Sequence, residues 1–322
     1  PAQQQDRLRQ AAGAPVTFAR NFLAYLNERF PPIANVLLIL TYYSSNQFLA
    51  IALTRPGHAM HYDRWSFLGM LMLVSFFFHI RVFDEHKDYE EDCRHYPQRV
   101  LQSGRVTLRH LKIAGAIAIA AQLVIVLARG TEATVAWAIA FGFTLLMLRE
   151  FFARDFLKRH FILYATSHML IMPLLSLLVF SFATRRWPWE APPWFWIYAF
   201  VGFFVTFNWE VSRKIRAPEQ ELEGVDSYTK IFGTFGAAYV VLLIRAIDTL
   251  LVAAVGHHLG VSNWFYAALG VLYAVCLAGF FQYRLRPTPR HAKMMEVYAG
   301  MYMIVFDLLV ALELGRKYGL TA

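Results

Sequence analysis

The chain has 322 residues, of which 57% are hydrophobic and 16% are charged, and its mean hydropathy is positive. A soluble domain of this length cannot bury so many apolar residues around one core, so the composition excludes an ordinary soluble protein and indicates lipid as the main solvent. The formal net charge of +9 would fit nucleic-acid binding, but the positions of the basic residues give it another cause.

The first element in chain order is a lead-in, residues 1–32, which we expect to be cytoplasmic or interfacial. Its later half carries apolar side chains at helical spacing, namely Phe18, Phe22, Leu23, Tyr25, Leu26 and Phe30. An amphipathic helix of this kind lies in the plane of the membrane surface. No basic region precedes a short apolar core, so we do not expect a cleavable signal peptide.

Residues 33–322 follow as a single expected membrane domain. Stretches of about 18 nearly uncharged residues, the length that a helix needs to cross a bilayer, recur through it. They predict an all-α integral membrane protein, a bundle of nine transmembrane helices at 33–53, 66–84, 111–129, 133–149, 161–182, 193–211, 234–256, 264–283 and 295–314.

The second predicted span runs into a dense acidic segment, the first acidic cluster. If the helix continues, Asp84, Asp88 and Asp92 lie four residues apart, and Glu85 joins them on the same face. Carboxylates this close repel one another unless a cation lies between them, and hard oxygen ligands suit Mg2+. Basic side chains that can bind phosphate oxygens are interleaved with them. These are Lys87, Arg94, Arg99 and Arg105.

Two polar residues around the fifth predicted span need an interpretation. From its position in the connection that precedes the span, Lys158 is an ordinary cytoplasmic loop cation. His168, within the span, either orients a hydroxyl group of an acceptor in the substrate pocket or packs between helices through a hydrogen bond.

The sixth predicted span ends in a second acidic cluster. Asn208 and Glu210 lie at its end, followed by the basic residues Arg213 and Lys214. Further carboxylates come next, at Glu219, Glu221, Glu223 and Asp226, ahead of Tyr228. We expect Glu210, Glu219, Glu221 and Asp226 to be metal ligands with Asp84, Glu85, Asp88 and Asp92. Asn208 and Tyr228 are expected in the substrate pocket.

The alternative interpretation, without any chemical role, is that both clusters form a solvated cytoplasmic face, as runs of charged residues usually do. It does not explain why both lie at equivalent helix ends with arginines among them. Two carboxylate clusters over one cavity would instead let metal ions clamp a diphosphate.

Three charged residues fall inside later spans. Arg245 and Asp248 are three residues apart, so we expect them to neutralise one another. Asp307 has no evident partner in its own span. It is a proton acceptor, a neutral acid or a partner of Arg245.

Of the 31 Lys and Arg residues, 23 lie in the lead-in and in the connections after the second, fourth, sixth and eighth spans. By the positive-inside rule, this alternation places the N-terminus in the cytoplasm, the C-terminus outside and both acidic clusters on the cytoplasmic side. We expect a prokaryotic inner membrane protein that binds the lipid bilayer and no nucleic acid.

The run from Asp84 to Asp92, followed by Arg99-Val100 and Ser103-Gly104-Arg105, resembles the first motif of the UbiA superfamily of intramembrane prenyltransferases. That motif reads Asn-Asp-x-x-Asp-x-x-x-Asp, with Arg-Pro and a Ser-Gly-Arg turn after it. Asp88 and Asp92 match directly, whereas Asp84 stands for the Asn and Glu85 for the first Asp. Arg99 takes the position of the diphosphate-binding arginine, and Val100 replaces the usual proline.

The family's second motif, Asp-x-x-x-Asp, is only half matched. Glu210 stands for its first Asp, but the second falls on Lys214. One of the later carboxylates would then supply the missing ligand.

The resemblance implies a nine-helix, UbiA-like fold with both motifs at the cytoplasmic face. It also implies that Mg2+ holds an isoprenyl diphosphate, that Asp88, Asp92 and Glu210 are catalytic, and that Lys87, Arg94, Arg99, Lys158, Arg213 and Lys214 bind diphosphate. Departure of pyrophosphate leaves an allylic cation, which a lipophilic, aromatic acceptor attacks.

Two other functions remain open. A membrane terpene cyclase or another diphosphate-cleaving enzyme would use the same metal site, and the departures at Asp84, Glu85 and Lys214 favour this alternative. A cation or proton transporter would place its carboxylates on broken helices near the bilayer midplane, whereas these lie at the ends of uninterrupted spans.

Overall fold

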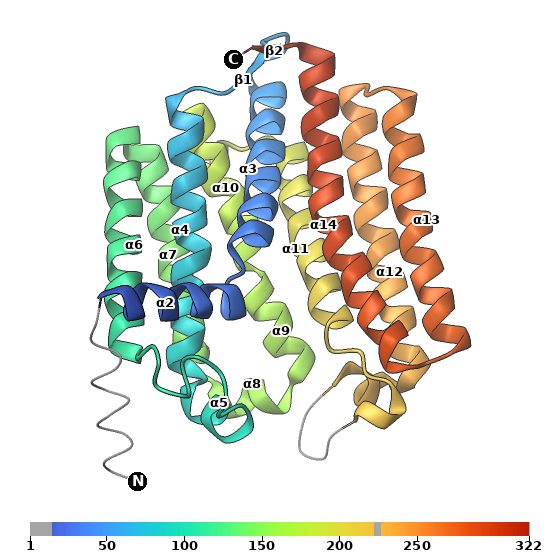
Figure 1. The fold of residues 1–322 in the computed structure, drawn as a ribbon. Coiled ribbons are helices and arrows are strands. Elements are labelled where there is room, and N and C mark those ends of the chain that lie inside the picture. Colours follow the sequence, from blue (N-terminus) through green and yellow to red (C-terminus); the bar gives the residue numbers. More distant parts are fainter. Residues whose placement is uncertain (1–14, 222–226, 322) are drawn as a thin grey trace. The chain divides into compact units, whose positions relative to one another are not determined.

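The protein was analysed as a computed structural model that describes residues 15–221 and 227–321 (Figure 1). Within these residues the chain is almost entirely helical. The α-helices are α2 (Pro15–Arg29), α3 (Pro32–Thr54), α4 (Arg64–Lys87), α5 (Tyr89–His95), α6 (Leu108–Arg129), α7 (Thr131–Leu148), α8 (Arg154–Arg159), α9 (Phe161–Met169), α10 (Ile171–Thr184), α11 (Pro193–Ser212), α12 (Tyr228–Leu259), α13 (Asn263–Leu285) and α14 (Pro289–Tyr318).

Short elements complete the fold. Three 3-10 turns are η1 (Glu150–Phe152), η2 (Pro188–Glu190) and η3 (Pro218–Gln220). The two-residue strands β1 (Met60–His61) and β2 (Leu320–Thr321) pair in parallel.

The chain divides into two compact units. The first unit comprises residues 1–40 and 67–129, and the second comprises residues 41–66 and 130–322. The first acidic cluster belongs to the first unit and the second acidic cluster to the second unit, so we describe each within its own unit.

In the first unit, α2 lies across the ends of α4 and α6 (Figure 1). The apolar face predicted for the lead-in explains this packing, because Tyr25 is fully buried with Val82 of α4 and Leu111 of α6. Val100 and Leu101, from the loop after α5, complete this core. The lead-in therefore forms a helix whose apolar face packs against the segment that carries the first acidic cluster, while its place at the membrane surface stays a prediction.

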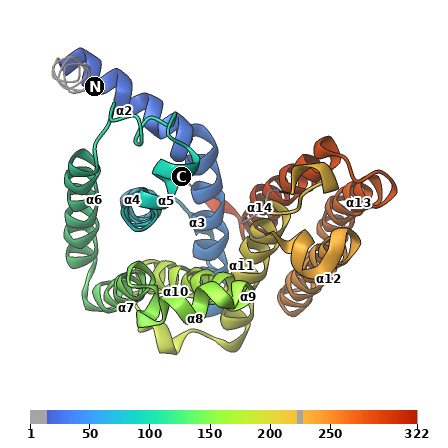
Figure 2. The same cartoon turned by 90° about the horizontal axis from the view of Figure 1, so that it is seen from below.

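In the second unit, α11 packs against α10, α12 and α14, and α13 packs against α12 and α14. Figure 2 shows α11 to α14 gathered along one another. A core around Val211, Tyr228, Ala237, Phe280 and Met295 joins the ends of these helices. This core fixes the end of α11, where Glu210 lies, against the start of α12.

Eight segments of the described chain are long and apolar enough to cross a membrane. They correspond to every predicted span except 193–211, which forms the continuous helix α11 but is rich in Trp and Tyr and is not among the eight. The all-helical membrane fold is confirmed. The count of nine spans, the orientation of the termini and the single domain at 33–322 stay predictions.

One predicted span is interrupted, and another is preceded by a bend in its helix. The span at 161–182 is divided at Leu170 into α9 and α10, three residues before Pro173, which has no backbone N–H to donate. Helix α12 bends at Gly233, whose φ of 74° is readily adopted only by glycine. The segments that carry the acidic clusters, α4 and α11, are unbroken.

Candidate active site

The helical path of α4 continues into α5 with only a local break at Asp88. The amide of Asp88 donates to the carbonyl of Asp84, and the amide of Asp92 donates to the carbonyl of Asp88, each at 2.9 Å. Because these bonds keep the four-residue spacing of an α-helix, the three aspartates fall on successive turns of one face. This local arrangement agrees with the sequence-based prediction.

The outer carboxylates of the first acidic cluster already have cationic partners. Arg29 contacts Glu85 at 2.6 Å and Asp92 at 3.4 Å, and Arg99 contacts Asp92 at 3.0 Å. Lys87 lies 3.4 Å from Asp84. The second oxygen of Glu85, Oε2, is buried without a hydrogen-bond partner among the described residues.

Asp88 differs from these neighbours, because its carboxylate has no hydrogen bond or ion pair within residues 15–221 and 227–321. Burial raises the pKa of Asp88 to about 6, with Lys87 lowering it and Asp84 and Asp92 raising it further. A half-buried carboxylate beside others of the same charge is the kind of group that a bound cation stabilises.

Helix α2 supplies contacts to this cluster that the sequence did not reveal. Besides the two ion pairs of Arg29, Glu28 accepts a hydrogen bond of 2.9 Å from the amide of Val100. A proline, which the family pattern has at this position, could not donate that bond. The two charged residues at the end of α2 therefore anchor both the acidic cluster and the loop that follows it.

The predicted phosphate-binding cations of the first unit differ in their surroundings. Arg99 is stacked on Tyr96, with its guanidinium carbon 3.7 Å from the ring centroid. Arg94 is exposed in the last turn of α5. The side chain of Lys87 is largely buried. Stacking and the ion pair to Asp92 orient Arg99, whereas Arg94 extends into solvent.

In the second unit, Glu210 is buried at the end of α11 and both of its oxygens are paired. Arg213 Nη2 lies 2.5 Å from Oε2, and Lys214 Nζ lies 2.7 Å from Oε1. The Lys214 ammonium also lies over the Phe161 ring, 4.5 Å from its centroid. Phe161 packs against Tyr228, whose buried hydroxyl has no partner in the described part of the chain.

The later carboxylates of the second acidic cluster are separated in the structure. Glu219 is exposed in η3. Glu221 is half-buried and accepts hydrogen bonds from the hydroxyls of Ser227, at 2.8 Å, and Thr229 at the start of α12. Asp226 and Glu223 lie outside the described residues. Of the carboxylates that follow Lys214, Glu221 is the one that the described chain holds in place.

Asn208 belongs to a buried polar network instead of facing open space. Its side-chain oxygen accepts from Arg245 at 2.6 Å, and its amide donates to the carbonyl of Val241, also at 2.6 Å. Arg245 is paired with Asp248 at 2.9 Å, which confirms the predicted neutralisation within α12. Asp307 accepts from Ser45 and Tyr198, and so is not the partner of Arg245.

The remaining predicted site residues lie around α8 and α9. His168 is buried between two aromatic rings, and its ring centroid lies 4.2 Å from that of Tyr164 and 5.5 Å from that of Phe151. Its Nδ1 lies 2.8 Å from the carbonyl oxygen of Tyr164. Lys158 is exposed on α8. These contacts fit the packing interpretation of His168, while its place in a substrate pocket stays a prediction.

Across the described residues, no three His, Cys, Asp or Glu side chains lie close enough together to hold a metal ion. The first acidic cluster nevertheless offers an unpaired carboxylate at Asp88 and an unpaired oxygen at Glu85, whereas Glu210 offers neither. The donor set of the first cluster fits a hard cation better than that of the second.

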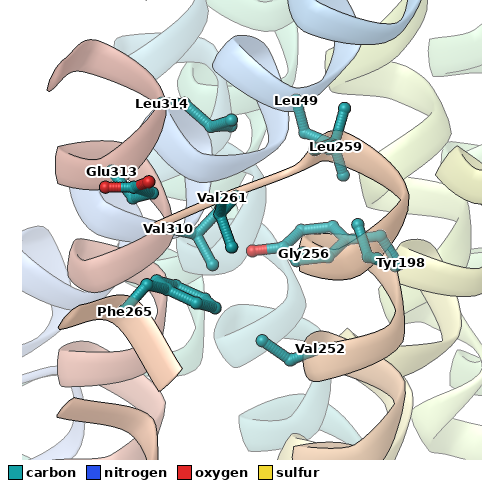
Figure 3. Close-up of a pocket in the computed structure, with 11 residues that line it drawn as sticks. Leu49, Tyr198, Val252, Gly256, Leu259, Val261, Phe265, Val310, Glu313 and Leu314 are labelled. Carbon is teal, nitrogen blue, oxygen red and sulfur yellow. The ribbon is translucent and has the colours of Figure 1, made fainter. Parts of the chain in front are cut away.

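A pocket at the other end of α12 from Tyr228 is almost wholly apolar (Figure 3). Its lining includes Val252 and Leu259 of α12, Phe265 of α13 and Val310 of α14. Glu313, also in the lining, accepts from the amide of Ser262 at 2.7 Å. The pocket has no charged group free for chemistry, and it is separate from Glu210 and Lys214.

The chain is similar to several solved structures. It matches a digeranylgeranylglyceryl phosphate synthase with 17% identity over 92% of this chain and 99% of the other, at a TM-score of 0.60. A UbiA homolog from Aeropyrum pernix K1 matches with 13% identity over 88% of this chain and 97% of the other, at a TM-score of 0.64. A UbiA homolog from Archaeoglobus fulgidus, bound to GPP and Mg2+, matches with 15% identity over 90% of this chain and 99% of the other, at a TM-score of 0.50.

Among curated proteins, no relative matches this chain. The model of the UbiA prenyltransferase family matches residues 29–304, a range that contains both acidic clusters and begins at Arg29. The chain is therefore an integral membrane protein that belongs to the UbiA prenyltransferase family.

Proposed function

We propose that this protein transfers an isoprenyl group from an isoprenyl diphosphate to a lipophilic, aromatic acceptor, with Mg2+ as cofactor. The observation that carries the proposal is the first acidic cluster, in which the unpaired Asp88 lies between Asp84 and Asp92 on one helical face. The family match over residues 29–304 supports it. So does the similar Archaeoglobus fulgidus homolog, which is bound to GPP and Mg2+.

The first cluster would hold the metal ion through Asp84, Asp88 and Asp92, with Glu85 as a further oxygen ligand. Bound Mg2+ neutralises the negative charge of a diphosphate group. Asp88 fits this role because its carboxylate is half-buried, unpaired within the described chain and close to other acids. Side-chain rotations of the paired acids would bring the ligands together.

The cations of both clusters would bind the phosphate oxygens. Arg99 is held by Tyr96 and Asp92, so its planar guanidinium is already oriented for a bidentate contact. Lys87, Arg94, Lys158, Arg213 and Lys214 would add positive charge. Glu210 would act through Arg213 and Lys214, which it orients.

The substrate pocket would lie among the aromatic side chains of the second unit. Tyr228 has a buried hydroxyl without a described partner, and His168 lies between two aromatic rings, so both fit a largely apolar substrate. Asn208 would position Glu210 through its bonds to Arg245 and Val241. We place the site at the cytoplasmic face of a prokaryotic inner membrane.

Release of pyrophosphate tests this proposal. Purified protein in detergent is given farnesyl or geranylgeranyl diphosphate, Mg2+ and a lipid extract as the source of acceptor. We expect the wild type to release pyrophosphate and the rate of release to fall about 100-fold in Asp88→Ala and Asp92→Ala, because each change removes a carboxylate ligand of the Mg2+ that neutralises the departing pyrophosphate. Glu91→Ala is the matched control, since it removes an exposed carboxylate from the same helix.

Mass spectrometry of the lipid product then separates the alternatives. A prenylated acceptor supports the proposed transfer. Release of pyrophosphate without any acceptor, together with a cyclic or hydroxylated hydrocarbon, indicates the terpene cyclase instead. Absence of release with either diphosphate, or equal release in Asp88→Ala, contradicts the enzymatic proposal.

A further inference from the structure

The start of the second acidic cluster, formed by Glu210, Arg213 and Lys214, is electrostatically unsuited to a metal ion. Glu210 is 4% exposed, and each of its two oxygens is paired with a different cation. Glu210, Arg213 and Lys214 together carry a net charge of +1. A divalent cation at this position would have to displace two ion pairs and would then face both cations at short range.

Lys214 stands where the family pattern has its second aspartate, four residues after Glu210. Its ammonium is a compact charge with three donor hydrogens, one of which is used by Glu210. The Phe161 ring, 4.5 Å away, holds the ammonium from another side, and the side chain stays partly exposed. The ammonium is therefore fixed in position, with donors left for an anion.

A second and independent observation also points to a ligand. The hydroxyl of Tyr228 is buried and has no hydrogen-bond partner among the described residues, although a buried polar group is normally paired. Its ring packs against the same Phe161, with the centroids 4.9 Å apart. Two donors, one charged and one neutral, thus lie around one aromatic ring.

We propose that the Lys214 ammonium replaces a metal ion in the second acidic cluster, so that this cluster binds phosphate directly through Lys214, Arg213 and the Tyr228 hydroxyl. Metal ions are then bound by the first acidic cluster alone. This inference rests on the proposed function, because it assumes that the substrate carries a diphosphate.

The first test measures the binding of inorganic pyrophosphate to the full chain in detergent, in metal-free buffer, by isothermal titration calorimetry. We expect the wild type to bind and Lys214→Ala to bind about tenfold more weakly, because one charge-assisted hydrogen bond is lost. Lys214→Arg should keep most of the affinity. Arg216→Ala is the matched control, since its guanidinium donates to the carbonyls of Arg213 and Ile215.

The second test counts bound Mn2+, a spectroscopic substitute for Mg2+, by electron paramagnetic resonance with pyrophosphate present. Lys214→Asp, which restores the family pattern, should bind about one more ion per chain than the wild type, because it converts a cation into a hard oxygen ligand. Equal counts in the two proteins would overturn the inference. So would an unchanged pyrophosphate affinity in Lys214→Ala.

Failure of the proposed function gives a different result. A wild type that binds neither pyrophosphate nor Mn2+ overturns the proposed function and this inference together. The inference alone is overturned if Asp88→Ala loses the Mn2+ that the wild type binds, while Lys214→Asp binds no more Mn2+ than the wild type. Size-exclusion profiles identify a variant that fails to fold, and the pyrophosphate comparison then uses Lys214→Met, which keeps the length of the side chain without its charge and should bind as weakly as Lys214→Ala.

Discussion

Individual ion pairs decide how the acids of this protein are available for chemistry. Glu85 is buried against Arg29, Asp92 is shared between Arg29 and Arg99, and Glu210 is fully paired. Among Asp84, Glu85, Asp88 and Asp92, Asp88 is the one without such a partner in the described structure. The function of each acid therefore follows from its cationic neighbours as much as from its place in a motif.

The pair between Arg29 and Glu85 gives a prediction about stability. Arg29→Ala should lower the free energy of unfolding by about 3 kcal/mol, because the Glu85 side chain, which is 0% exposed, keeps its charge without a partner. Thermal unfolding in detergent measures this. Arg20→Ala, an exposed arginine on the same helix, is the matched control and should change little.

Removing the orphaned charge provides the complementary test. The double variant Arg29→Ala with Glu85→Gln should recover much of the lost stability, since no unpaired carboxylate remains. If the single and double variants unfold at the same temperature, the ion pair is not what holds α2 to the first acidic cluster.

Some of these residue-level contacts could be predicted from the sequence and others could not. The spacing of Asp84, Asp88 and Asp92 is local, so helical periodicity alone places them on one face. Arg29 reaches Glu85 across 56 positions of the chain, and that contact exists only because α2 folds back across α4. The sequence shows Lys214 as a mismatch in a motif, but its pairing with Glu210 becomes visible only in the structure.

The places of the helices were more predictable than their ends and breaks. Hydropathy finds the apolar middle of a span, so the prediction 295–314 falls inside α14, which covers Pro289–Tyr318. The polar ends of the helix continue its hydrogen bonds without adding to the apolar signal. The breaks at Leu170 and Gly233 lie within apolar stretches, where composition does not change.

Close packing between α13 and α14 leads to a prediction at the scale of the element. A methyl group added at Gly279 would overlap the ring of Tyr298, whereas one added at Gly270 of the same helix would meet nothing within 4 Å. Gly279→Ala should therefore destabilise the protein by about 1–3 kcal/mol. Gly270→Ala should stabilise it by up to about 1 kcal/mol, because alanine favours helix.

The two glycine variants are compared by thermal unfolding in the same detergent. Their sequence context and the chemical change are alike, so the difference between them reports the space available between the helices. Equal effects would mean that α13 and α14 do not approach one another at Gly279 as described.

For the whole molecule, the distribution of basic residues predicts its orientation in the membrane. The basic connections predict that α5, with Cys93, lies on the cytoplasmic side and that the connection containing Arg186 lies outside. In a Cys276→Ser background, a membrane-impermeant maleimide should label Cys93 in inverted vesicles but not in intact cells.

A second cysteine reports the other side of the membrane. In a protein that also lacks Cys93, Arg186→Cys should be labelled in intact cells, because Arg186 is exposed in a connection expected outside. Labelling of both sites from one side would contradict the predicted topology, and a reversed pattern would place the acidic clusters outside the cell.

The buried acids of the second unit have a consequence for biosynthesis. Asp248 finds its counter-charge, Arg245, within α12 itself, so this helix enters the bilayer as a neutral segment and needs no other helix for that step. Asp307 of α14 depends instead on hydroxyls from Ser45 and Tyr198, two helices made earlier. Asp307 is therefore hydrogen-bonded within the membrane only after the helices that carry Ser45 and Tyr198 have been inserted. We expect membrane integration to proceed sequentially, from the N-terminal helices to the C-terminal one.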